Sequence, residues 1–127
     1  MINTIAAIAA GGAIGALLRH GVNVAAVKML GHGFPYGTLT VNIVGSFIMG
    51  ALIVIFAHIA QPTETLRVFL ITGLLGAFTT FSTFSLDFAA LFERGEYINS
   101  GIYLSTSVIL SIAALFGGMA IMRGVVS

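Results

Sequence analysis

The chain has 127 residues, of which 58% are hydrophobic and only 7% are charged, and its mean hydropathy is +1.11. A soluble domain carries about 25% charged residues, so this composition excludes an ordinary water-exposed fold. The formal net charge of +1 gives no indication of a nucleic-acid partner. Cysteine is absent, which excludes disulfides, thiolate chemistry and cysteine-ligated metals.

Four apolar segments are each long enough to cross a bilayer, which takes about 20 mostly apolar residues per helix. Short linkers with glycine, proline or charged turn signals separate them. The composition therefore predicts an all-α membrane protein, with residues 1–127 forming a single integral membrane domain. The expected spans are Asn3–Val27, Tyr36–Ala60, Leu66–Phe92 and Tyr97–Arg123.

The first span combines small residues with one charge. Gly11 and Gly15 form a G-x-x-x-G pattern, which allows two helices in lipid to approach closely. Arg19 follows one turn later inside the span, where an unpartnered charge is costly. Two roles are consistent with this position. The arginine either braces the fold, by reaching the interface or the carbonyls of a broken helix, or attracts an anion.

The second span places Thr38, Asn42, Gly45 and Met49 on one face. The amide of Asn42 can donate to an anion or accept from a cation. It can equally form an interhelical hydrogen bond, which contributes about 0.6 kcal/mol on average in membranes. Considered alone, Asn42 favours the interhelical hydrogen bond.

The fourth span carries a polar stripe with a spacing of four residues. Steps of four drift by only about 40° around a helix, so such side chains stay on one side for several turns. A pair of serines would indicate helix packing, whereas a stripe of this length favours a lined path. Its members are Asn99, Tyr103, Ser107 and Ser111.

The segment Gly73–Phe88 of the third span is unusually polar for a membrane helix. Its sequence GLLGAFTTFSTFSLDF interleaves threonine and serine hydroxyls with phenylalanines. Tandem β-branched threonines after glycines form a weak helix, so we expect a break at Gly76–Thr79, near the middle of the third helix. An unwound turn releases carbonyls that can hold a monovalent cation. Hydroxyl donors and positive aromatic ring edges suit an anion path. The residues indicate an ion pathway and leave the ion open.

The basic residues at the span ends are evenly divided. Lys28 and Arg94 lie at one side of the membrane, and Arg67 and Arg123 lie at the other. An excess of Lys and Arg on the cytoplasmic side normally sets the orientation of a membrane protein, and here there is none. The balance predicts that the chain inserts in both orientations and forms an antiparallel, dual-topology homodimer. The alternative is a single orientation determined by another feature, such as the terminal amine.

With these motifs the sequence resembles the small bacterial fluoride-channel family (Fluc, CrcB-type), and the four-span layout matches over nearly the whole chain. The run TTFSTFS with GTLxVN upstream is the specific signature. The resemblance rests on Gly12–Arg19 (GAIGALLR), Gly37–Gly50 (GTLTVNIVGSFIMG) and Gly73–Ser85 (GLLGAFTTFSTFS). One departure is Ala77-Phe78, where the family more often has Gly-Leu.

The resemblance implies a multi-pass protein of the bacterial cytoplasmic (inner) membrane that exports fluoride passively and limits its toxicity. It implies an antiparallel homodimer with two pores. A central structural sodium ion, which is not transported, would bind the backbone carbonyls of Gly76 and Thr79. The pore residues implied by the family motif are Asn42, Phe81, Phe84, Ser82, Thr83, Tyr103, Ser107, Ser111 and Arg19.

Three other classes of protein fit the sequence less well than a channel does. A proton-coupled multidrug or cation exporter can also be a small four-span dual-topology dimer, but it needs a membrane-embedded acid, and Asp87 is the only acid within a span. A structural subunit would tolerate conservative changes at the pore positions. An enzyme is not expected, because His20, His32 and His58 lack metal-ligand spacing and no catalytic triad can be assembled.

Overall fold

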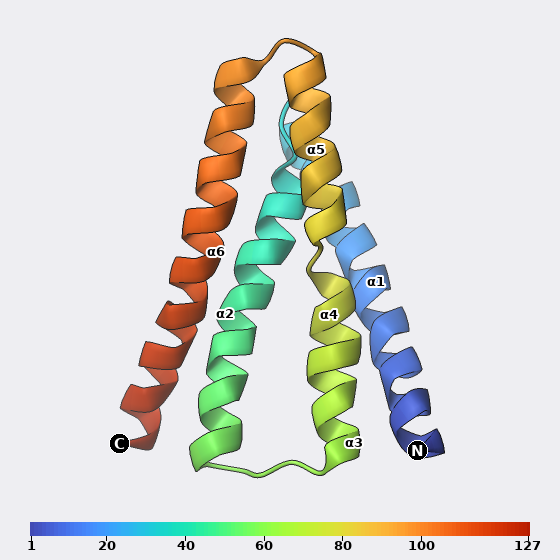
Figure 1. Ribbon diagram of the computed structural model, residues 1–127, viewed down its shortest axis with the longest axis vertical. Coiled ribbons are helices and arrows are strands. Elements are labelled where there is room, and N and C mark those ends of the chain that lie inside the picture. The colour runs from blue at the N-terminus through green and yellow to red at the C-terminus, as the bar shows by residue number, and fades with distance from the viewer.

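A computed structural model describes all 127 residues, and it is entirely helical (Figure 1). Four helical segments are long and apolar enough to cross a membrane, as the sequence predicts. The third comprises four shorter elements in succession. The elements are α1 (Ile2–Leu30), α2 (Tyr36–His58), α3 (Glu64–Arg67), the π-helix η1 (Val68–Leu75), α4 (Gly76–Phe78), α5 (Phe81–Glu93) and α6 (Tyr97–Val126).

The chain crosses from end to end four times, so both termini lie at the same end as the α2–α3 connection (Figure 1). The α1–α2 and α5–α6 connections lie at the opposite end. Lys28 is in the last turn of α1 and Arg94 directly follows α5, whereas Arg67 ends α3 and Arg123 is in the last turn of α6. The predicted two-against-two division of basic residues is confirmed.

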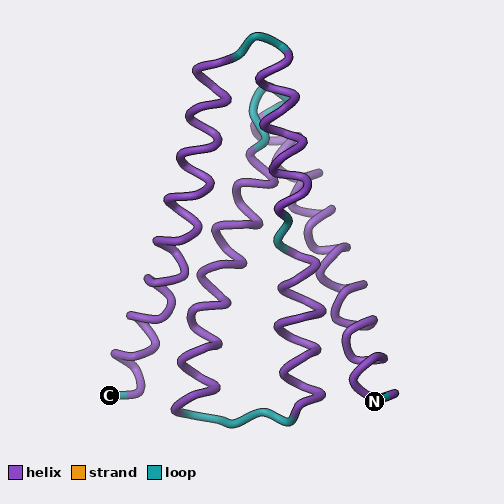
Figure 2. Tube along the Cα trace, in the orientation of Figure 1, coloured by secondary structure: helices purple, strands orange, loops and turns teal.

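The predicted break in the third span is confirmed, and its position is slightly different from the expected one. Gly76 is still helical, in α4, and the extended residues are Thr79 and Thr80 (φ −86°, ψ 157° and φ −155°, ψ 123°). Figure 2 shows the short non-helical segment between α4 and α5. The β-branched threonines, which tolerate extended backbone better than helix, thus determine the position of the break more than the glycine does.

Glycines allow close contact between two pairs of helical segments, α1 with the third span and α2 with α6. A Cβ at Gly11 or Gly15 of α1 would collide with the backbone oxygens of Phe69 and Leu74, so the third span lies directly against α1. In the second pair, a Cβ at Gly50 of α2 would meet the Leu115 backbone of α6. Close backbone approach through small residues is the usual packing mode in lipid, and the G-x-x-x-G prediction is confirmed.

Few residues of the chain are buried, namely 18 of 127. Large apolar residues such as Leu17, Ile109 and Phe116 remain exposed along the helices. This is the expected outer surface of a protein whose solvent is lipid, since lipid tails are as apolar as the side chains.

Candidate functional site

The break in the third span is held by side chains of its own threonines. The Thr79 hydroxyl donates to the carbonyl of Leu75 at 2.9 Å, directly at the end of α4. The Thr80 hydroxyl accepts from the Thr83 N–H at 3.2 Å and caps the start of α5. Threonine is a favoured N-cap residue because its oxygen replaces a missing helical acceptor. The TTFST sequence therefore encodes both ends of the break locally.

Asn42 of α2 provides the long-range contact that stabilises the break. Its Oδ1 accepts from the Thr80 N–H at 2.8 Å, and its Nδ2 donates to the Thr80 carbonyl at 3.1 Å. One side-chain amide thus satisfies both backbone groups of an extended residue, which in the bilayer has no water to bind. A primary amide has two donor hydrogens, so one hydrogen remains free. The interhelical hydrogen bond expected for Asn42 is present.

Arg19 also acts on the break. Its Nε donates to the carbonyl of Ala77 at 3.0 Å, at the carboxyl end of α4, where a helix presents unsatisfied carbonyls and partial negative charge. Arg19 lines neither of the two pockets described below. Of its two predicted roles, the structure shows the bracing contact.

Two carbonyls at the break lose their normal helical donors. In an α-helix the N–H of residue i bonds the carbonyl of residue i−4, so Gly76 and Thr79 would receive bonds from Thr80 and Thr83. The Thr80 N–H donates to Asn42 instead, and the Thr83 N–H donates to the Thr80 hydroxyl. The carbonyls of Gly76 and Thr79 are therefore available to another partner. These are the two carbonyls that the family resemblance assigns to sodium.

A pocket of about 360 Å³, here called the central pocket, lies beside the break between α2, α5 and α6. It contains no Asp, Glu, Lys, Arg or His side chain. The predicted residues Asn42, Phe81, Phe84, Ser107 and Ser111 are brought together here. The full lining is Asn42, Ser46, Thr79, Thr80, Phe81, Phe84, Ser107, Val108, Ser111 and Ile112.

The hydroxyls of Ser107 and Ser111 have no hydrogen-bond partner, although both oxygen atoms are buried. They lie one helical turn apart on α6 and both line the central pocket. Buried polar groups in native proteins are nearly always satisfied, so an unsatisfied pair calls for an explanation. Two hydroxyl donors without acceptors, in a pocket without charged side chains, are consistent with a polar ligand that binds there transiently.

The aromatic residues of the site form a row that runs from Phe81 through Phe84 to Tyr103. The ring centroids of Phe81 and Phe84 are 5.6 Å apart, and those of Phe84 and Tyr103 are 5.2 Å apart. Phe84 and Tyr103 are buried, whereas Phe81 is 76% exposed at the open side of the pocket. The Tyr103 hydroxyl donates to the Asp87 carboxylate at 3.1 Å. Tyr103 thereby connects the central pocket to the region around Asp87.

A second pocket of about 250 Å³, here called the outer pocket, lies toward the end of the molecule that carries the α1–α2 and α5–α6 connections. It is lined by residues that include Asn23, His32, Thr38, Thr83 and Asp87. Tyr103 contacts Phe84 of the central pocket and Asp87 of the outer pocket, so it lies between the two. Tyr103 itself is buried and lines neither pocket.

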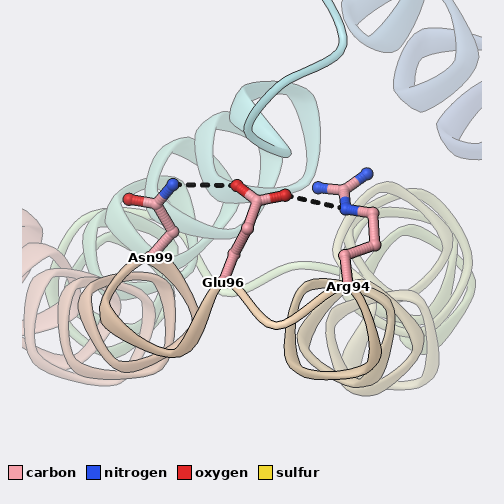
Figure 3. A network of polar contacts seen from close by, with 3 residues as sticks. All are labelled: Arg94, Glu96 and Asn99. Atoms are coloured by element: carbon pink, nitrogen blue, oxygen red, sulfur yellow. Dashed lines mark hydrogen bonds and ion pairs between the residues drawn. The ribbon is translucent and has the colours of Figure 1, made fainter.

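The structure separates the predicted site residues into groups. Thr83 lines the outer pocket and not the central one, while Ser82 is exposed, lines neither pocket and lies 3.4 Å from the Thr80 hydroxyl. Asn99, the first member of the predicted stripe, instead donates to Glu96, which pairs with Arg94 at 2.9 Å (Figure 3). The stripe that faces the site therefore begins at Tyr103.

Several features of the site were not predicted from the sequence. Ser46 lines the central pocket, Asp87 accepts a hydrogen bond from the Tyr103 hydroxyl, and η1 is a π-helix. Ser46 lies four residues after Asn42, and this spacing was the available signal. No such signal marks the π-helix, which packs against α1.

The fold and the site together define a multi-pass integral membrane protein with an uncharged polar pocket beside a broken helix. Residues 6–119 match the family described as CrcB-like protein, Camphor Resistance (CrcB), and the chain belongs to this family.

Similar proteins include one from Rhizobium etli strain CFN 42, which is 51% identical over 119 residues, or 94% of this chain and 95% of the relative. Another, from Agrobacterium fabrum strain C58, is 50% identical over 97% of this chain and 98% of the relative. A third, from Cereibacter sphaeroides strain ATH 2.4.9, is 48% identical over 98% of both. All three are called "Fluoride-specific ion channel FluC".

Proposed function

We propose that this protein is a fluoride-specific ion channel of the bacterial inner membrane, through which fluoride leaves the cytoplasm down its gradient and its toxicity is reduced. The observation that carries the proposal is the pair of unsatisfied hydroxyls, Ser107 and Ser111, in a pocket without charged side chains. Such donors can replace part of the water shell of a small anion, and the lack of a fixed cation lets the ion leave. The similar proteins named above supply the identity of the ion.

The pocket chemistry supports a channel over a proton-coupled exporter. Exchange of protons for a cation needs an acid at the transport site, and no Asp or Glu lines the central pocket. Asp87 lines the outer pocket, where its carboxylate accepts from Tyr103. The phenylalanines Phe81 and Phe84 add ring edges with partial positive charge to the hydroxyl donors. Both features suit an anion that moves without coupling.

The experiment that tests the function is ion efflux from liposomes containing the purified protein and loaded with potassium fluoride. Addition of valinomycin should trigger fluoride efflux, and liposomes loaded with potassium chloride should show none. Equal efflux of the two halides would contradict the fluoride selectivity. Efflux that requires an imposed proton gradient would support the exporter.

We infer that the working unit is the antiparallel homodimer. The basic residues are balanced between the two ends, and Phe81 and Gly76 are exposed at the middle of a single chain beside the break. A second copy in the opposite orientation would bring its own break to the same depth of the bilayer. Phe81 and the carbonyl of Gly76 would then face protein and not lipid.

Added lysines test this arrangement. A variant with Gln61→Lys and Ser127→Lys biases one end toward the cytoplasm, and a variant with Gly33→Lys and Ile98→Lys biases the other. Each variant alone should give no fluoride efflux, and their co-expression should restore it. Full activity of either variant alone, with every copy in one orientation, would contradict the antiparallel dimer.

We further propose that sodium binds the break as a structural ion. The carbonyls of Gly76 and Thr79 are freed from helical bonds, and two copies would offer four such oxygens, which is a suitable donor set for a hard monovalent cation. No cluster of acidic or histidine side chains offers a competing metal site. When bound, the ion supplies positive charge that joins the two breaks.

Replacement of sodium by N-methylglucamine should therefore lower the thermal stability of the purified dimer as well as slow fluoride efflux. Titration of sodium back into the sample should restore both, and the stability readout does not depend on ion flux. A melting temperature and an efflux rate that stay constant in sodium-free buffer would contradict the structural sodium.

A further inference from the structure

Ser46 lines the central pocket but is not among the pore residues that the family resemblance implies. It lies on α2 one helical turn after Asn42, so the two share a face. We propose that Ser46 is an anion-binding residue of the central pocket that donates its hydroxyl to fluoride, together with Ser107 and Ser111. This inference rests on the proposed function and extends it by one specific donor.

A count of the available donors supports Ser46. The Thr79 hydroxyl donates to the carbonyl of Leu75. The Thr80 hydroxyl accepts from the Thr83 N–H and lies 3.4 Å from the Ser82 hydroxyl, a contact in which either oxygen can donate. Asn42 uses its oxygen and one amide hydrogen on the backbone of Thr80. Besides the Thr80 hydroxyl, which contacts Ser82, the lining offers one Asn42 hydrogen and the hydroxyls of Ser46, Ser107 and Ser111, none of which donates to a protein group.

The three serines lack the side-chain hydrogen bond that several other hydroxyl residues in the helices form. A helical serine or threonine commonly donates to the carbonyl four residues before it. Thr106 does so with Ile102 at 2.7 Å, and Ser85 does so with Phe81 at 3.1 Å. Ser46, in contrast, takes part in none of the side-chain hydrogen bonds of the chain.

The placement of these donors on two helices suits a small anion. Ser46 belongs to α2, whereas Ser107 and Ser111 belong to α6, and these two helices pack closely along their length. An ion in the central pocket can thus receive hydrogen bonds from both helices. The pocket holds no cationic side chain that could compensate the anion for its lost water. The neutral donors must therefore replace that hydration, and each one contributes a share.

The test measures fluoride efflux from liposomes over a range of fluoride concentrations. Ser46→Ala should lower the efflux rate about tenfold below saturation, the change expected for one lost hydrogen bond to an ion, and should raise the half-saturating concentration. Ser46→Thr keeps the hydroxyl and should retain most of the activity. Ser105→Ala is the matched control, because Ser105 is an exposed serine of α6 that lines neither pocket.

Coupling between the serines provides a second readout. If Ser46 and Ser107 bind the same ion, the double variant Ser46→Ala/Ser107→Ala should lose less activity than the product of the two single losses. Ser46→Gly serves in place of Ser46→Ala if the alanine variant does not assemble. Unchanged efflux in the Ser46 variants, or equal losses in Ser46→Ala and Ser46→Thr, would overturn the inference. A wild-type protein without fluoride efflux would instead refute the proposed function.

Discussion

Replacement of Asn42 by alanine is expected to abolish fluoride efflux and to destabilise the protein. The variant leaves the N–H and the carbonyl of Thr80 without partners in the membrane interior. An unsatisfied backbone group of this kind costs roughly 1–3 kcal/mol. To avoid this cost, the Thr80 N–H would bond the Gly76 carbonyl, as in a continuous helix, and the break would close. We expect an efflux rate at least 100-fold lower, together with a lower melting temperature.

The matched control is Asn99→Ala, because Asn99 is an exposed amide that bonds Glu96 at the start of α6 (Figure 3). That variant should keep normal efflux. Asn42→Asp distinguishes the effects of the two hydrogen bonds, because it keeps an acceptor for the Thr80 N–H and loses the donor to the Thr80 carbonyl. Wild-type efflux and stability in Asn42→Ala would show that the break forms without this contact.

Gly15→Ala is expected to prevent correct packing of α1 against the third span, and with it both folding and efflux. The added Cβ would collide with the carbonyl oxygen of Leu74, a backbone atom that cannot rotate away. Overpacking of this kind typically costs 1–3 kcal/mol. The effect would extend to the site, because Arg19 lies one turn beyond Gly15 and bonds Ala77 beside the break.

Gly12→Ala is the control for this prediction, since a Cβ at Gly12 meets no atom within 4 Å. Alanine is the better helix former by about 1 kcal/mol, so Gly12→Ala should be neutral or slightly stabilising. Size-exclusion profiles and melting temperatures of the two variants check the contrast. Equal stability of the two would contradict the close contact between α1 and the third span.

The spans and the broken helix could be predicted from the sequence because local properties determine them. Hydropathy over about 20 residues identifies each span, and the tandem threonines Thr79 and Thr80 weaken the helix on their own. The G-x-x-x-G pattern of Gly11 and Gly15 likewise identifies a packing face without knowledge of the partner. These features need no information about the rest of the chain.

The details of the site could not be predicted, because they depend on contacts between helices that the local sequence does not specify. The family resemblance assigns Ser82 and Thr83 together to the pore, whereas the structure exposes Ser82 and places Thr83 in the outer pocket. The bond from Arg19 to Ala77 also joins residues far apart in the chain. The contributions of the pore residues to ion conduction stay predictions.

The contact between Asn42 and Thr80 also has a consequence for the order of assembly. A lone helix in lipid must satisfy its own backbone groups, so the third span is expected to insert as a continuous helix. The extended conformation of Thr79 and Thr80 becomes favourable only when α2 supplies the amide. A synthetic peptide of residues 64–93 in a bilayer should therefore be helical through Thr80 by solid-state NMR. The break is encoded locally by its threonines but is completed late, as a product of helix docking.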